Sequence, residues 1–98
     1  MDWLNISPKK NKNLAWRIID GEAVIIPLAN QPKEGQRIDI LNATATRIWE
    51  LCSGKNSTRH IIALLKDEYD APATVIESAV KRIISELSKE KLILIKEG

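Results

Sequence analysis

The sequence holds little of the material from which catalytic and metal centres are built. Its 98 residues include one cysteine, one histidine and no phenylalanine, and its four glycines lie far apart. A single cysteine excludes an intramolecular disulfide and any metal site made of several cysteines. Isolated glycines also exclude a glycine-rich phosphate loop.

A long apolar run and a strong charge of one sign are missing too. No run reaches the roughly 20 apolar residues that a membrane span needs, and residues 1–13 lack the apolar core of a secretory signal. Fifteen Lys and Arg stand against 13 Asp and Glu, a net charge of +2, without a basic stripe. A nucleic-acid partner is therefore disfavoured, since such proteins gather basic residues on one face. We expect a cytoplasmic protein of one domain, with no membrane partner.

The reactive side chains that remain do not form a recognisable site. Cys52 falls on an apolar helical stripe and is best interpreted as a buried small hydrophobe. His60 fits a solvent-facing position in the first turn of a helix, and Asp67, Glu68 and Asp70 fit a solvated helix end. We predict no catalytic residue, no metal ligand and no cofactor, and a chain that is not itself an enzyme.

The first half of the chain has the pattern of β-strands. Residues 1–13 are polar and rich in lysine, and we interpret them as an N-terminal arm ahead of a domain over 14–98. Two β-rich runs, 14–20 and 22–28, flank Asp20-Gly21. This pair favours a type I′ hairpin turn, in which both central residues need positive φ.

A third strand is predicted over residues 36–41, where polar and apolar residues alternate. Ile38 and Ile40 share one face of this strand, and Arg37 and Asp39 share the other. The strand is therefore expected to be half-buried and to complete a three-stranded meander.

Three helices follow. Asn42 fits an N-cap, Ser57 or Thr58 caps the second helix, and Pro72 suits the first turn of a third helix over about 73–90. Their apolar stripes contain Ala45, Ile48, Trp49 and Cys52, then Ile61, Leu64, Leu65 and Tyr69, then Ile76, Val80, Ile83 and Leu87. The predicted fold is an α+β, winged-helix-like domain of order βββααα, and residues 92–98 either add a strand or cover the groove beside strand three.

The stretch DILNATATRIWELCSGKNSTRHIIALLKDEYDAPATVIESAVKRIISELSKEKLI resembles the PqqD family. The resemblance extends over about residues 14–95, and its strength lies in the order of the matches rather than in any one of them. The matching residues are Leu41-Asn42, Thr44, Ile48-Trp49, Leu51, Gly54, Thr58, Ile61, Leu65, Tyr69, Val75, Val80, Leu87 and Leu92.

The resemblance implies a peptide-binding module, also called a RiPP recognition element. Such modules hold the leader of a ribosomally made precursor peptide and deliver it to a modifying enzyme, most often a radical SAM protein and otherwise a leader protease or cyclase, as in PQQ biosynthesis. The leader adds as a strand to the third strand and lies against the third helix. In this chain the implied peptide-binding residues are Arg37, Ile38, Asp39, Ile40, Leu41, Val75, Ala79, Arg82 and Ile83.

Other interpretations stay open. From the residues alone, an ordinary core position for Val75 and Ala79 is as good as a groove; the resemblance favours the groove. The runner-up function is a winged-helix DNA-binding protein, although Glu77 near the start of the third helix would repel phosphate. A structural domain that forms homodimers through an edge strand is the third possibility.

Overall fold

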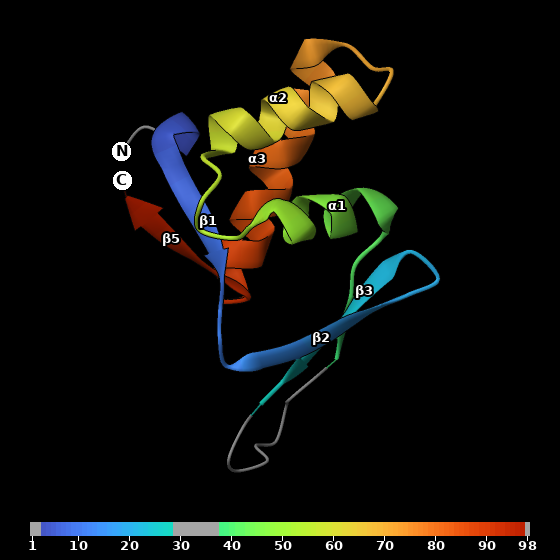
Figure 1. Cartoon of the computed structure of the whole chain (residues 1–98), viewed down its shortest axis with the longest axis vertical. Helices are drawn as coiled ribbons and strands as arrows, with labels where there is room; N and C mark the ends of the chain where they lie inside the picture. Colours follow the sequence, from blue (N-terminus) through green and yellow to red (C-terminus); the bar gives the residue numbers. More distant parts are fainter. Residues whose placement is uncertain (1–2, 29–37, 98) are drawn as a thin grey trace.

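The computed structural model describes residues 3–28 and 38–97 and confirms the α+β class (Figure 1). A three-stranded antiparallel sheet precedes three helices, and a two-stranded ribbon lies beside the helices. Within the described ranges no helix is long and apolar enough to cross a membrane. The elements are η1 (Trp3–Asn5), β1 (Ile6–Lys10), β2 (Leu14–Ile19), β3 (Glu22–Pro27), β4 (Asp39–Ile40), α1 (Ala43–Leu51), α2 (Thr58–Glu68), α3 (Ala73–Lys89) and β5 (Ile93–Glu97).

The predicted meander is present as the sheet β2-β3-β4. Asp20 and Gly21 have φ angles of 51° and 80°, which confirms the hairpin turn between β2 and β3. Strand β4 pairs antiparallel with β3 and has no other strand partner in the described sheet. It is therefore an edge strand of the described sheet.

The face assigned to the third strand is wrong. Ile38 and Ile40 are exposed by 59% and 64%, so the expected apolar face looks toward solvent. Asp39 pairs instead with Ile25, whose side chain is fully buried. Because paired residues in a sheet share a face, Asp39 is on the inner side. The short strand takes its register from β3 and α1, so its own pattern of alternation does not decide which face is buried.

The N-terminal segment, interpreted from the sequence as a polar arm, contains a β-strand. Ile6–Lys10 form β1, which pairs antiparallel with β5, and the tail thus adds a strand here rather than covering β4. Ile6 and Pro8 are buried, and the Thr58 hydroxyl donates to the Ile6 carbonyl at 3.3 Å. This strand is hard to recognise in the sequence because it contains a proline and two lysines, and neither residue type is typical of strands.

The helices begin where their caps predict. The Asn42 side chain accepts a hydrogen bond from the Ala45 N–H at 2.8 Å, and Ser57 accepts from the His60 N–H at 3.1 Å. Helix α3 begins directly after Pro72. The helical core contains Ile48, Trp49, Cys52, Ile61, Ile62, Leu65, Ile76, Val80, Ile83, Ile84 and Leu87.

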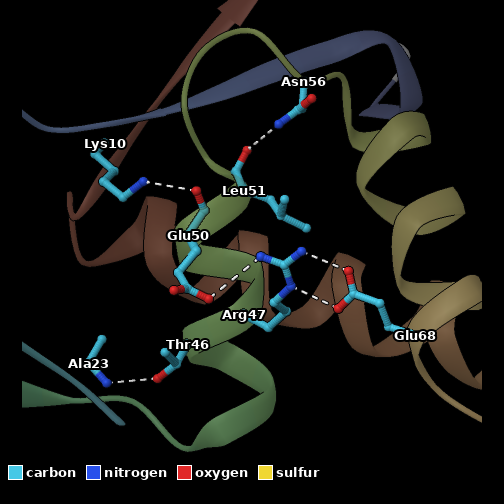
Figure 2. Close-up of polar contacts among 8 residues, drawn as sticks. All are labelled: Lys10, Ala23, Thr46, Arg47, Glu50, Leu51, Asn56 and Glu68. Atoms are coloured by element: carbon cyan, nitrogen blue, oxygen red, sulfur yellow. Dashed lines mark hydrogen bonds and ion pairs between the residues drawn. The ribbon is translucent and has the colours of Figure 1, made fainter. Parts of the chain in front are cut away.

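Lys10 connects β1 to the end of α1. Its Nζ donates to the Glu50 carbonyl at 3.3 Å (Figure 2) and to the Cys52 carbonyl at 3.2 Å, which places a cation at the carbonyl end of the helix. The same Nζ lies 5.1 Å from the ring centre of Trp16 and 5.4 Å from that of Trp49. Burial lowers the pKa of Lys10. Trp16 is 40% exposed, so its side chain is only partly buried.

One buried hydroxyl joins the sheet to α1. The Ala23 N–H donates to Thr46 Oγ1 at 2.8 Å (Figure 2), and that hydroxyl donates to the Leu41 carbonyl at 3.2 Å. Leu41 in turn donates its N–H to the Ala23 carbonyl at 2.9 Å. Thr46 therefore stands in for the second ladder bond that Ala23 and Leu41 would share in a longer antiparallel pair.

Removal of this hydroxyl should destabilise the fold. In Thr46→Val the shape is kept, but the Ala23 N–H and the Leu41 carbonyl lose their partner in a buried place, so the free energy of unfolding should fall by about 2 kcal/mol. Urea unfolding followed by circular dichroism measures the change. Thr44→Val, at an exposed position of the same helix, should stay within about 0.5 kcal/mol. Equal midpoints for the two variants would contradict this role of Thr46.

Candidate functional site

The candidate reactive groups lie apart and in unreactive settings. Cys52 is fully buried, and burial raises the pKa of its thiol to about 12. A nucleophilic cysteine needs the opposite shift. His60 is exposed in the first turn of α2, as predicted. Among the described residues no group of three or more His, Cys, Asp or Glu is arranged to hold a metal ion.

An apolar cavity of about 320 Å³ lies between α1, the end of α2 and the first half of α3. Side chains from all three helices form its walls, and most of them are aliphatic. The lining residues are Asn42, Thr44, Ile48, Leu65, Tyr69, Ala71, Val75, Ile76, Ala79, Val80, Arg82 and Ile83. We call this space the α1–α3 groove.

All four residues that the sequence assigned to the helical side of the site line this groove: Val75, Ala79, Arg82 and Ile83. Val75 is 55% exposed and the small Ala79 is half-buried, so this flank of α3 is not ordinary core. A second, shallower hollow continues over Thr74 and Ser78 along the same helix. A chain could therefore lie along α3 with its backbone close to Ala79.

The strand side of the predicted site is adjacent to the groove rather than part of its lining. Ile38, Asp39, Ile40 and Leu41 are described but do not line the groove, and Arg37 lies outside the described residues. The link between the two parts is Asn42, which comes directly after Leu41 and lines the groove. The chain thus passes from the end of β4 to the wall of the cavity within two residues.

The open edge of β4 presents backbone groups. Leu41 directs its N–H toward β3, where the Ala23 carbonyl accepts it. Successive residues of a strand alternate between the two edges, so the N–H and the carbonyl of Ile40 point away from β3. An edge of this kind pairs readily with another extended chain.

Sequence reasoning missed the opposite wall of the groove. Ile48, Leu65 and Tyr69 line the cavity from α1 and α2, although their helical spacing assigned them to the core. Tyr69 is 38% exposed. The pattern of an apolar stripe shows which residues turn inward, but it does not separate the part that meets another helix from the part that borders an opening.

An ion pair ties the two helices of this wall together (Figure 2). Arg47 donates from Nε and Nη2 to the two carboxylate oxygens of Glu68, at 2.8 and 2.7 Å. These bonds raise the pKa of Arg47 and lower that of Glu68. Because a bidentate pair restrains orientation as well as distance, Arg47 and Glu68 form a defined link between α1 and the end of α2.

One comparison with known proteins identifies a family. The family model described as "Coenzyme PQQ synthesis protein D (PqqD)" matches residues 31–93, more than half of the chain. No curated protein matches the sequence.

Two solved structures are similar in fold. One is TbiB1 in complex with the TbiA(beta) leader peptide, at 21% identity and a TM-score of 0.73 over 87% of this chain and 93% of that chain. The other is lasso peptide synthetase B1 complexed with the leader peptide, at 17% identity and a TM-score of 0.74 over 90% and 98%.

The buried thiol makes the free energy of unfolding depend on pH in the alkaline range. The thiol of the unfolded chain ionises near its ordinary pKa of 9.0, whereas that of folded Cys52 ionises near 12. The contribution of this thiol to the free energy of unfolding is therefore complete below pH 9. It is lost as the pH rises from 9 toward 12, by about 1.4 kcal/mol per pH unit. Cys52→Ala should lack this loss. Urea unfolding at pH 8, 9, 10 and 11 compares the two proteins, and parallel stability curves would contradict the prediction.

Proposed function

This chain belongs to the PqqD family, and from that premise we propose that it binds the leader of a ribosomally made precursor peptide and delivers the peptide to a modifying enzyme. One observation carries the proposal: β4 is an edge strand of the described sheet, and Asn42, two residues after its end, lines an apolar groove against α3. The two similar structures are both complexes with leader peptides, which supports the same kind of ligand here.

In the proposed complex the leader adds to β4 as a further strand. The N–H and carbonyl of Ile40 supply main-chain bonds, which hold many sequences, whereas selectivity comes from side-chain pockets. Every second leader side chain then points to the inner face of the sheet, toward the α1–α3 groove. We assign Arg37, Ile38, Asp39, Ile40 and Leu41 to the strand side of this site and Val75, Ala79, Arg82 and Ile83 to its helical side.

Arg82 is the charged group at the rim of the groove. Its partner is Glu86 at 3.5 Å, and both side chains are nearly two-thirds exposed. An exposed pair one helical turn apart contributes little, so Arg82 can turn to a carboxylate of the leader and bind it with two parallel hydrogen bonds. We expect an acidic residue in the leader near its apolar anchor.

We further infer that the module acts by binding and not by catalysis, and that it works in the cytoplasm. The raised pKa of Cys52, its full burial and its absence from the residues that line the α1–α3 groove support a non-catalytic role. The DNA-binding alternative is less well supported, because Glu77 is a negative charge on the exposed face of α3. Glu77 also pairs with Lys66 at 3.9 Å, so that lysine is already bound to a carboxylate.

A bulky side chain in the groove should block the leader. We expect Ala79→Phe to weaken binding of the leader encoded beside this gene at least about tenfold, since the ring fills the apolar space that an anchor side chain needs. Fluorescence anisotropy with a labelled leader measures the affinity. Ser85→Phe, on the other flank of the same helix, is the matched control and should bind as the unchanged protein does. Equal affinity for all three, or binding of duplex DNA in place of the leader, would refute the proposed site.

Strand addition can be tested at Ile40. Proline there removes an N–H that points away from β3 and leaves the ladder with β3 intact, so the protein should fold normally. Leader affinity should fall about tenfold through the loss of one main-chain bond and the clash of the ring with the added strand. Ile40→Ala removes only the outward side chain and should have a smaller effect. Titration followed by amide NMR compares the variants, and an unaffected Ile40→Pro would argue against strand addition.

A further inference from the structure

A second groove runs along the opposite flank of α3 and shares no residue with the first. It has a volume of about 370 Å³ and lies between the helix, η1 and the β1-β5 ribbon. We call it the β5 groove. Its lining residues are Trp3, Ile6, Lys81, Ile84, Ser85, Ser88, Lys89 and Ile95.

The β5 groove also lies beside an edge strand. The described ribbon contains only β1 and β5, and the far side of β1 is occupied, because Gly54 donates its N–H to the Pro8 carbonyl at 2.9 Å and Lys9 bridges to Ser53. The outer edge of β5 therefore has no strand partner among the described residues, and Figure 1 draws β5 at the outside of the ribbon. Ile95 of this strand lines the groove, while the neighbouring Leu94 is 52% exposed.

The charged side chains among the described lining residues of the β5 groove have one sign. Lys81 and Lys89 both line it, and their separation of eight residues on a helix is about 12 Å. Lys81 Nζ lies 5.7 Å from the ring centre of Trp3. Among the described residues that line the groove there is no carboxylate, and the two acidic residues of α3, Glu77 and Glu86, pair with Lys66 and Arg82. Glu90 directly follows Lys89 but is not one of the described lining residues. The groove therefore complements an apolar segment that carries negative charge.

We propose that the β5 groove binds an extended, acidic segment of the peptide-modifying enzyme. Apolar side chains of that segment would pack between Trp3, Ile84 and Ile95, and its carboxylates would meet Lys81 and Lys89. The inference rests on the proposed delivery of a leader, which requires leader and enzyme to be held at the same time. Opposite flanks of α3 provide two sites that do not compete.

A second copy of this chain fits the same groove less well. Edge-to-edge pairing of two β5 strands would be symmetric, so it would bring the basic rim of one copy toward the identical rim of the other. Like charges across an interface oppose association. An acidic partner has no such penalty.

The test uses two kinds of change in the full chain. Lys81→Glu/Lys89→Glu reverses the rim charge, and Ser85→Phe fills the groove with the charge unchanged. Lys55→Glu/Arg59→Glu makes the same change of charge at exposed positions outside both grooves. Biolayer interferometry measures the affinity for the purified modifying enzyme encoded beside this gene, and anisotropy measures the affinity for the leader.

We expect both β5-groove variants to bind the enzyme at least about tenfold more weakly and the leader within about twofold of the unchanged protein. Ala79→Phe should show the reverse, and Lys55→Glu/Arg59→Glu should retain both affinities. The inference is overturned if the unchanged protein does not bind the enzyme, if the groove variants bind it normally, or if they lose the leader. It is also overturned if sedimentation shows a dimer that Lys81→Glu/Lys89→Glu dissociates. If the unchanged protein binds the enzyme but no leader, the proposed function fails. The assignment of the β5 groove to the enzyme then depends only on whether the β5-groove variants weaken enzyme binding.

Discussion

The hydroxyl of Thr46 is the contact on which the candidate site depends. It accepts from the Ala23 N–H and donates to the Leu41 carbonyl, and so joins β3, the end of β4 and α1 at one buried point. This junction sets the register of a strand only two residues long. The register in turn directs the backbone groups of Ile40 outward and brings Asn42 to the mouth of the α1–α3 groove.

Helix α3 is the other organising element, because it is a wall of both grooves. Its buried centre packs against the rest of the core, while Ala79 borders one opening and Ser85 borders the other. Small residues on both flanks leave room for a chain to approach closely. A helix of 17 residues, anchored along its middle, can thus present two surfaces without any movement of the domain, and the two proposed partners would not compete for space.

Part of the helical half of the candidate site followed from the sequence: spacing put its residues on one flank, while the family resemblance, and not the spacing, favoured a groove there. Val75, Ala79, Arg82 and Ile83 follow helical spacing, so they had to share a flank wherever the helix was placed. The strand half was only partly predictable. An edge position followed from the order of the strands, but the buried face did not, because α1 and β3 decide it. Tyr69 and Ile48 were missed since an apolar stripe looks the same beside a neighbour and beside an opening.

The sequence by itself determined the features that depend on nearby residues: the Asp20-Gly21 turn, the caps at Asn42 and Ser57, and the length of α3. Only the tertiary structure decided that Ile6–Lys10 pair with Ile93–Glu97, that Ile40 faces solvent and that two cavities flank α3. The reason is physical. Turns and caps are set by local φ angles and short hydrogen bonds, whereas strand pairing and cavities arise from contacts between segments far apart in the chain, whose register no local pattern specifies.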